Sequence, residues 1–338
     1  MSTEKIAIVG SVGCGKTVLL AVLTHCFQRR TEEGYQIIPD NQDATNFCLQ
    51  RWAELQHCQW PAPTPPMEKP PVYRWKLING TSERQMVTSD IAGEAWRSFI
   101  VEGVEANADA TVQSKWREVK EAVTSIQTTL AQSTIEQHIT SIENLLKDSS
   151  GIFLLLDLSQ IINKEPGFDL AMFLPTALHQ YMKKIGRADV PIFLVLSKTD
   201  KYRYVLEEKG DWQKVLETYL PWAPPFAAVI PVAAVANTKT VIRDGESEEL
   251  PAPDFGSEGL KELYERIWQT MSKHETRKIL RTLKWFCLID VPVLLMMWII
   301  YILVVAVSSS ANFCAVVFWL ELLAYGGIKV ALYMIKTR

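Results

Sequence analysis

The sequence predicts an α/β fold: a mainly parallel sheet with helices on both faces, a helical insert, and a C-terminal pair of apolar helices. Three observations lead to this prediction. An apolar strand, a glycine-rich loop and an amphipathic helix follow one another over residues 5–30. Continuous apolar segments then alternate with helical ones, as in sheets that are covered on both faces. Two long apolar runs come last in the sequence.

The individual elements follow from apolar periodicity and from turn residues. Strands are expected at 5–10, 72–79, 84–90, 152–157, 191–196 and 228–232. Helices are expected at 17–30, 41–58, 168–186, 203–219 and from Ser257 onward, with a Pro-rich linker at 61–71 and a polar loop at 237–253. Residues 101–150 are rich in Gln, Glu and Thr, and their apolar residues recur at helical spacing, so this insert is expected to form two amphipathic helices.

The predicted domain organisation separates a water-facing part from an apolar tail. Residues 1–272 form the globular domain, 273–284 a basic helix, and 285–307 and 313–335 two runs that are each long enough to cross a bilayer. The short connection and the flanking Lys and Arg residues predict a transmembrane hairpin with both ends in the cytosol. Since no apolar export segment precedes the first strand, the globular domain is expected to be cytosolic. The alternative is a pair of core helices in a large soluble protein.

Composition excludes several classes of function. The formal net charge of −3 gives no support to nucleic-acid binding, which favours basic proteins. The six cysteines contain no C-x-x-C pair and the five histidines are scattered, so neither a zinc site nor a disulfide framework is indicated.

The glycine-rich loop reads G-S-V-G-C-G-K-T over residues 10–17 and matches the phosphate-binding pattern G-x-x-x-x-G-K-[ST]. The helix after it points free N–H groups at phosphate oxygens. In this interpretation Lys16 neutralises the outer phosphates and Thr17 ligates Mg²⁺. The predicted phosphate-binding residues are Gly10, Gly13, Cys14, Gly15, Lys16, Thr17 and Val18. A glycine-rich turn that matches by chance is the alternative, and the flanking strand and helix argue against it.

Two further motifs follow predicted strands. Asp90-x-x-Gly93 suits an aspartate that reaches Mg²⁺ through water and a glycine N–H that senses the terminal phosphate. In the segment 197–200, Ser-Lys-Thr-Asp, the Asp200 carboxylate can accept two hydrogen bonds from guanine N1 and N2, while Lys198 packs its stem along the base. Ligands bind at the carboxyl ends of strands in open α/β sheets, where all three motifs lie. If 197–200 is instead a helix cap, an ATP-dependent role stays open.

These three motifs resemble those of the Ras-like GTPases, within the translation-factor-related class of P-loop GTPases. The resemblance covers roughly residues 1–100 and 150–270 and implies binding of GTP or GDP with Mg²⁺, slow hydrolysis, and two switch segments. It implies that Ser197 stands where the family usually has Asn or Thr, and that the backbone of Ala233 and Ala234 contacts the guanine oxygen. Thr64 is the candidate for the first-switch threonine that ligates Mg²⁺; a rigid Pro-rich spacer is the alternative.

The residues that the resemblance places in catalysis are Lys16, Gly93 and Glu94. Glu94 stands where Ras-like proteins carry the Gln that orients the attacking water, and its charge is unfavourable beside a triphosphate. Val12 stands where the family often has Gly, and its branched side chain crowds the space that an incoming arginine needs. Both departures predict slow hydrolysis without a partner.

The two halves together predict a membrane-anchored GTP-binding protein that acts as a nucleotide-controlled switch or assembly module. The expected partners are guanine nucleotide, the lipid bilayer, an effector or activating protein, and a second copy of the chain. Glu321 within the second apolar run is the hint of self-association, because a polar contact from another protomer would satisfy it. Two alternatives stay open: a GTP-gated effector that perturbs membranes, analogous to bacterial conflict-system GTPases, and a membrane-tethering machine resembling atlastin-like proteins.

Overall fold

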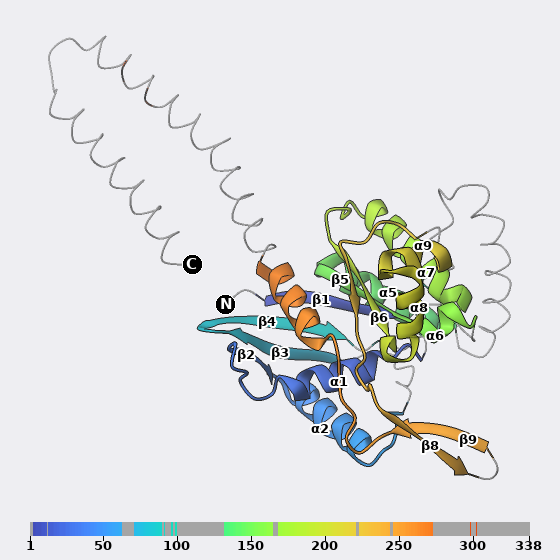
Figure 1. Cartoon of the computed structure of the whole chain (residues 1–338). Helices are drawn as coiled ribbons and strands as arrows, with labels where there is room; N and C mark the ends of the chain where they lie inside the picture. Colours follow the sequence, from blue (N-terminus) through green and yellow to red (C-terminus); the bar gives the residue numbers. More distant parts are fainter. Residues whose placement is uncertain are drawn as a thin grey trace. The chain divides into compact units, whose positions relative to one another are not determined.

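The computed structural model describes residues 3–11, 13–62, 71–89, 91, 96, 99, 132–164, 168–220, 223–243, 246–272, 298 and 302 (Figure 1). The chain divides into two units, Met1–Glu275 and Thr276–Arg338. In the second unit the described residues are Trp298 and Ile302, both helical, with 44% and 43% of their surface exposed. Across the described ranges no helix is both long enough and apolar enough to span a bilayer. The basic helix and the two apolar runs that the sequence predicts lie otherwise outside the described residues.

A seven-stranded sheet organises the first unit, in the order β2-β3-β4-β1-β5-β6-β7. Its strands are β1 (Thr3–Gly10), β2 (Tyr35–Pro39), β3 (Val72–Asn79), β4 (Ser82–Ser89), β5 (Ser149–Asp157), β6 (Ile192–Ser197) and β7 (Ala228–Pro231). Strand β1 pairs in parallel with β4 and β5, and β6 pairs in parallel with β5 and β7. The pairs β2-β3 and β3-β4 are antiparallel. The mainly parallel sheet that the sequence predicts is therefore confirmed.

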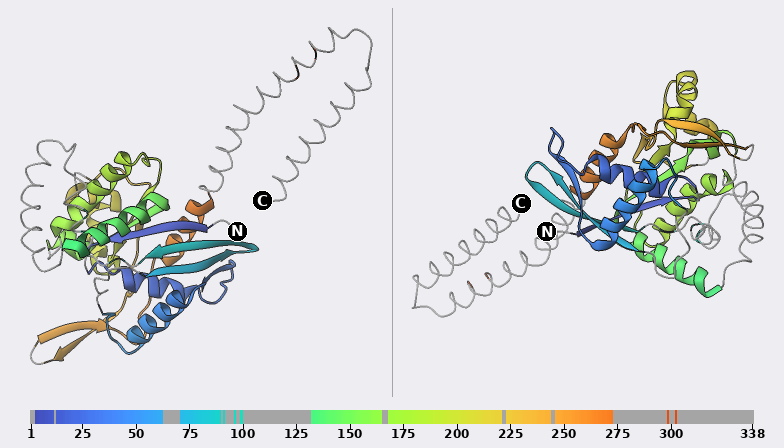
Figure 2. Two further views of the ribbon diagram at one scale, coloured as in Figure 1. Left: turned by 180° about the vertical axis from the view of Figure 1, so that it is seen from behind. Right: turned by 90° about the horizontal axis from the view of Figure 1, so that it is seen from below.

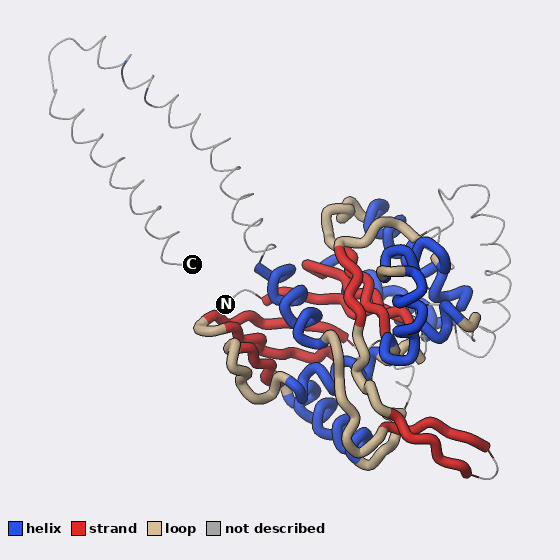
Figure 3. The backbone as a smooth tube through the Cα atoms, in the orientation of Figure 1, coloured by secondary structure: helices blue, strands red, loops and turns tan. Residues whose placement is uncertain are grey.

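Helices cover both faces of this sheet (Figure 3). The helices α1 (Lys16–Cys26) and α2 (Gln42–Gln56) lie on one face, together with a helix over residues 260–272. The other face carries α5 (Gln132–Asp148), α6 (Leu158–Ile162), α7 (Phe168–Lys184), α8 (Arg203–Lys209) and α9 (Trp212–Tyr219). Alternate residues of β1 enter the two cores: Ile6 and Ile8 join the first, Ala7 and Val9 the second. Both faces are apolar because the strand is buried between two layers of helices.

The helix over residues 260–272 is fixed to the antiparallel end of the sheet by one tyrosine. The Tyr264 side chain is fully buried, and its hydroxyl lies 2.6 Å from the Ile78 carbonyl oxygen of β3 and 3.2 Å from the Gln36 carbonyl oxygen of β2. Burial raises the pKa of Tyr264 to about 12. This hydroxyl therefore stays protonated and donates a hydrogen bond at neutral pH.

The structure corrects several details of the sequence prediction. Strand β2 is an edge strand that the sequence did not indicate. The helix predicted at 203–219 is two helices, because Gly210 adopts a positive φ of 89° at the end of α8 and Asp211 caps the start of α9. In the predicted insert, α5 confirms helical structure from residue 132, strand β5 already begins at Ser149, and residues 101–131 lie outside the described part.

The largest correction concerns the polar loop predicted at 237–253. Strands β8 (Thr238–Arg243) and β9 (Glu246–Pro251) form an antiparallel hairpin there, separate from the main sheet. The hairpin projects from the first unit, next to the end of α2 (Figures 1 and 2). The backbone hydrogen bond from Ala252 N to Asn237 O, 3.1 Å, closes its base. The hairpin was predicted as a loop because its strands are mostly polar: an exposed two-stranded sheet needs no apolar face, so the sequence shows no apolar alternation.

Candidate functional site

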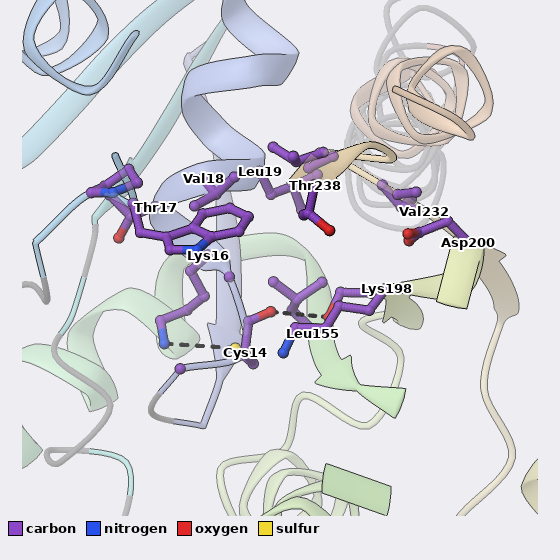
Figure 4. A pocket seen from close by; sticks show the side chains of 18 of the residues that line it. Cys14, Lys16, Thr17, Val18, Leu19, Leu155, Lys198, Asp200, Val232 and Thr238 are labelled. Atoms are coloured by element: carbon purple, nitrogen blue, oxygen red, sulfur yellow. Dashed lines mark hydrogen bonds between the residues drawn. The ribbon is translucent and has the colours of Figure 1, made fainter. Parts of the chain in front are cut away.

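A cavity of about 450 Å³ lies at the carboxyl ends of the parallel strands. The loop after β1 with the first turn of α1, the turn after β6 and the loop after β7 contribute most of its walls. Figure 4 shows Lys16 and Thr17 at one end of the cavity and Asp200 at the other. Of the predicted binding residues, those that line it are Gly13, Cys14, Gly15, Lys16, Thr17, Val18, Ser197, Lys198, Asp200, Ala233 and Ala234. The fold thus gathers three segments that are far apart in the sequence.

The loop between β1 and α1 curls because two glycines adopt left-handed backbone conformations. Gly13 has φ 73° and Gly15 has φ 92°, values that other residues adopt at a cost. Gly15 is the N-cap of α1 and has no side chain to satisfy the free N–H groups of the first turn. These N–H groups are therefore available to an anion in the cavity.

Gly10 does not line the cavity but sits beneath the loop. A Cβ atom at this position would lie 2.6 Å from the Leu155 carbonyl oxygen of β5 and 2.5 Å from Cys14 Sγ. Only glycine allows the loop to pack this closely on the neighbouring strand. Gly10 therefore shapes the loop. It was predicted to bind phosphate, but it is not one of the residues that line the cavity.

Lys16 is buried, and its ammonium group lies against the backbone at the start of the loop. Its Nζ donates to the carbonyl oxygens of Gly10 at 3.0 Å and of Ser11 at 2.9 Å. Within the described residues no carboxylate forms an ion pair with Lys16. The Cys14 Sγ atom lies 3.9 Å from the same Nζ. A buried cation whose described partners are neutral groups is well placed to attract an anion such as phosphate.

Ser197, the last residue of β6, joins the turn after β6 to the loop after β1. Its hydroxyl donates toward the Cys14 carbonyl oxygen at 3.0 Å and also lies 3.3 Å from the Leu156 carbonyl oxygen. Cys14 itself is buried, and burial raises the pKa of its thiol, so it stays protonated. The Ser197 contact fixes the two ends of the cavity at a set distance from each other.

Lys198 is held by a buried carboxylate that the sequence analysis did not identify. Its Nζ lies 2.5 Å from Asp157 Oδ2, and the Asp157 side chain, at the end of β5, is 2% exposed. The other oxygen, Oδ1, accepts hydrogen bonds from the Ser159 backbone N–H at 2.8 Å and the Ser159 hydroxyl at 2.7 Å. The Lys198 backbone adopts φ 60°, at the start of the turn to residues 199–202. Asp157 thus positions the lysine stem along the cavity.

Asp200 lines the cavity and carries an unsatisfied acceptor. Its Oδ1 is buried and has no hydrogen-bond partner within the described part of the chain. Burial raises the pKa of this carboxyl, although the backbone N–H groups of Asp200 and Lys201 oppose the rise. A buried acceptor without a donor is costly, so this oxygen favours a ligand that brings N–H groups.

The loop after β7 is fixed by the turn before the helix over 260–272. Ala233 and Glu258 exchange backbone hydrogen bonds, with Ala233 N to Glu258 O at 3.1 Å and Glu258 N to Ala233 O at 2.8 Å. Gly259 makes this approach possible: it has φ 73°, and a Cβ atom there would lie 2.0 Å from the Pro231 carbonyl oxygen. Ala233 and Ala234 are therefore held in a fixed wall of the cavity.

The remaining predicted site residues, Thr64, Asp90, Gly93 and Glu94, lie outside the described residues, as does Val12. Their nearest described neighbours in the sequence, Ala62 and Ile91, both line the cavity. The described ranges contain no group of three or more His, Cys, Asp or Glu side chains that would hold a metal ion. Of the predicted Mg²⁺ ligands, Thr17 lines the cavity within the described part.

The sequence analysis missed a further wall of the cavity. Trp60 and Pro61 line it from the segment after α2, and Thr238 and Glu249 line it from the β8–β9 hairpin. The indole Nε1 of Trp60 donates to the Glu249 carbonyl oxygen at 2.7 Å. For the hairpin one signal was available in the sequence: the pair Asp244-Gly245, because Asp-Gly is typical of two-residue hairpin turns. For Trp60 the sequence carries no comparable signal.

Comparisons with known proteins give a fold likeness at low identity. The chain matches no protein-family model and no curated protein sequence. Similar solved structures include a single-substitution variant of SsGBP (14% identity, 82% of this chain, 57% of that chain, TM-score 0.38). Another is Roco2 RocCORdC of Methanosarcina barkeri bound to GDP (12% identity, 81% of this chain, 50% of that chain, TM-score 0.33). A third is translation elongation factor SelB of Methanococcus maripaludis with the GTP analogue GPPNHP (13% identity, 80% of this chain, 35% of that chain, TM-score 0.31).

The chain spans 57% of the length of the first of these structures and smaller shares of the other two. At such identities and TM-scores the likeness carries no argument about activity. The functional conclusion therefore rests on the residues of the cavity.

Proposed function

We propose that this protein binds guanine nucleotide with Mg²⁺ and hydrolyses GTP. The observation that carries the proposal is the buried Asp200 Oδ1, which lacks a partner in the described structure and belongs to a residue of the cavity that the phosphate-binding loop also lines. Guanine offers two adjacent N–H donors, at N1 and N2, to such a carboxylate, whereas adenine presents a ring acceptor in the same place. The cavity volume of about 450 Å³ falls within the range of small-molecule sites.

Different residues of the cavity bind different parts of the nucleotide. The free N–H groups at the start of α1 and the Lys16 ammonium group bind the phosphates, since both favour negative charge. The Lys198 stem, held by Asp157, packs along the base, and Asp200 accepts from its edge. A Mg²⁺ ion with Thr17 among its ligands would neutralise charge on the outer phosphates. Thr64 and Asp90 complete the proposed set of metal ligands.

The proposed hydrolysis is slow without a partner, with Lys16, Gly93 and Glu94 at the reacting phosphate. Glu94 supplies a negative charge where a neutral, water-orienting group is more effective. Single-turnover measurements on the purified chain test this proposal. A rate faster than about one per second would contradict it, whereas a faster rate in Glu94→Gln than in the wild type would support it.

Binding is tested by calorimetry on the full chain with Mg²⁺, comparing GDP with ADP. We expect a clear preference for GDP, and we expect Lys16→Ala to weaken GDP binding by at least about tenfold, since hydrogen bonds to charged groups contribute about 1.5–3 kcal/mol each. Lys5→Ala is the matched control, because Lys5 is an exposed lysine of the same strand-loop-helix unit that pairs with Asp148. Equal affinity for GDP and ADP would refute the guanine assignment.

We further propose that the segments 285–307 and 313–335 anchor the protein in a membrane, with the nucleotide domain in the cytosol. The support is their apolar sequence and length, which suit a bilayer of about 30 Å. Alkaline extraction of membranes from cells that produce the full chain tests this, since an anchored chain stays in the pellet. Release of the chain into the supernatant would contradict it.

In this proposal, binding of GTP or GDP changes how the protein assembles or contacts an effector at the membrane surface. In a second candidate function, the two apolar segments 285–307 and 313–335 are themselves the effector. Glu321 in the second segment favours it, because a carboxyl group within a bilayer is costly and the ionisable residues that do occur there usually serve a function. Leakage of dye from vesicles that carry the full chain separates the two. A pure anchor gives no GTP-dependent leakage, whereas a membrane-perturbing effector gives leakage that Glu321→Gln reduces.

A further inference from the structure

The β8–β9 hairpin contributes a wall to the nucleotide cavity although it lies outside the main sheet. Thr238 and Glu249 both line the cavity. In the hairpin register Thr240 pairs with Glu249, and Thr238 pairs with Pro251. Because paired residues and alternate residues share a face, Thr238 and Glu249 lie on the same face of the hairpin, near the end that joins the main body.

Glu249 connects two other walls of the cavity. Its backbone carbonyl oxygen accepts the hydrogen bond from Trp60 Nε1, 2.7 Å, and its carboxylate forms an ion pair with Lys201. Lys201 follows Asp200 directly, so Glu249 lies between the segment after α2 and the turn that carries the base acceptor. The Glu249 side chain lines the cavity and is 52% exposed, so a ligand can reach it from solvent.

The two ends of the cavity leave one position for the sugar of a nucleotide. If the phosphates lie on the loop of residues 13–17 and the base lies at Asp200, the ribose lies between them. The hairpin and the segment after α2 line the cavity there. A carboxylate at such a position commonly accepts hydrogen bonds from ribose hydroxyls, and it retains lone pairs for this purpose while it is paired with a lysine. Thr238 offers a hydroxyl group on the same hairpin face.

We propose that the base of the β8–β9 hairpin is a ribose-binding site, in which the Glu249 carboxylate accepts hydrogen bonds from the sugar hydroxyls. Trp60 is a positioning residue that holds the Glu249 backbone in place. This inference rests on the proposed function, because it needs the base and phosphates at the ends named above. It gives the hairpin a specific chemical role, namely discrimination of ribonucleotides from nucleotides that lack sugar hydroxyls.

The test compares GDP with 2′,3′-dideoxy-GDP by calorimetry on the full chain. We expect the wild type to bind the dideoxy compound roughly three- to tenfold more weakly, the range for hydrogen bonds at a partly exposed site. In Glu249→Ala this ratio should fall to about one, because the acceptor is lost. The backbone contact with Trp60 stays in this variant. Glu249→Gln keeps one carbonyl acceptor, so its ratio should lie between those of Glu249→Ala and the wild type.

Two controls separate sugar recognition from hairpin stability. Lys201→Gln breaks the ion pair but keeps Glu249, so its ratio should match that of the wild type. A shortened hairpin, in which Val241 and Glu248 are joined by Asn-Gly, keeps both cavity-lining residues because those two positions pair in the register. It should also retain the ratio.

The possible outcomes distinguish the two proposals. Equal binding of GDP and dideoxy-GDP by the wild type, or an unchanged ratio in Glu249→Ala, would overturn the ribose site while leaving guanine binding intact. Failure of the wild type to bind any guanine nucleotide would overturn the proposed function and the ribose site with it.

Discussion

The exchange Asp200→Asn tests the central contact of the proposed site. The amide keeps one oxygen acceptor for guanine N1–H but turns its NH₂ group toward the guanine amino group, so two donors face each other. Xanthine carries an oxygen in place of that amino group and can accept from the same NH₂. The substitution should therefore weaken guanine binding and improve xanthine binding, with little change in the shape of the cavity.

The expected magnitude follows from the environment of Asp200. Its Oδ1 is buried and, within the described part of the chain, has no partner, so the ligand supplies the missing donor. Losing one charge-assisted hydrogen bond costs about 1.5–3 kcal/mol, and the unfavourable donor pair adds to this loss. A total near 3 kcal/mol corresponds to a roughly 100-fold rise in the Kd for GDP.

The assay is competition calorimetry on the full chain with GDP, xanthosine diphosphate and ADP. Asp148→Asn is the matched control, because it makes the same chemical change at an exposed aspartate that pairs with Lys5. The thermal midpoint of the unliganded Asp200→Asn protein should not fall, since burial already disfavours the charged carboxylate. An unchanged affinity for GDP in Asp200→Asn, with no gain for xanthosine diphosphate, would refute base recognition by this residue.

Three further predictions concern the supports of the site. Ser197→Ala removes the hydrogen bond to the proposed phosphate-binding loop and should raise the Kd for GDP roughly two- to tenfold; an unchanged Kd would contradict that role. Tyr264→Phe should lower the free energy of unfolding by about 1–2 kcal/mol in urea titrations, because the bond to the Ile78 carbonyl is lost. Gly259→Ala should cost more than about 3 kcal/mol, since its Cβ would lie 2.0 Å from the Pro231 oxygen; two-state urea curves that match those of the wild type would contradict this.

The tyrosine prediction also has a pH dependence. The folded-state pKa of Tyr264 is raised to about 12, whereas an unfolded tyrosine ionises near about 10. The raised value means that the hydroxyl contributes stability that is complete below about pH 10 and is lost as the pH rises through about 12. Urea titrations between these values should therefore show a steeper loss of stability in the wild type than in Tyr264→Phe. Parallel pH profiles would contradict the assignment.

Much of the site was predictable because its motifs are short and local. Residues 13–18 lie between a strand and a helix whose apolar patterns are clear, and the structure places all six at the cavity. Ser197 and Asp200 follow a continuous apolar strand, so their position at a strand end could be inferred. Asp157 also follows such a strand, yet its role depends on Lys198, forty-one residues later, which the local pattern does not reveal.

The hairpin and the segment after α2 could not be assigned in the same way. Thr238 and Glu249 occur in a polar stretch, and Trp60 in a Pro-rich one, and neither pattern identifies a neighbour in space. The contact between Trp60 and Glu249 spans 189 positions of sequence and is made through a backbone carbonyl, which every residue possesses. Edge strand β2 was missed for a related reason, since only Ile37 among its five residues is buried.

The sequence alone determined the mainly parallel sheet, the positions of its buried strands along the chain and the glycine-rich loop after β1, because burial on both faces and tight glycine turns leave local patterns. The tertiary structure decided which distant residues make contact at and around the cavity: Asp157 with Lys198, Ser197 with Cys14, and Trp60 with Glu249. Such contacts depend on how strands are ordered in space, and the energy of a hydrogen bond or ion pair depends on distance and burial, not on separation along the chain.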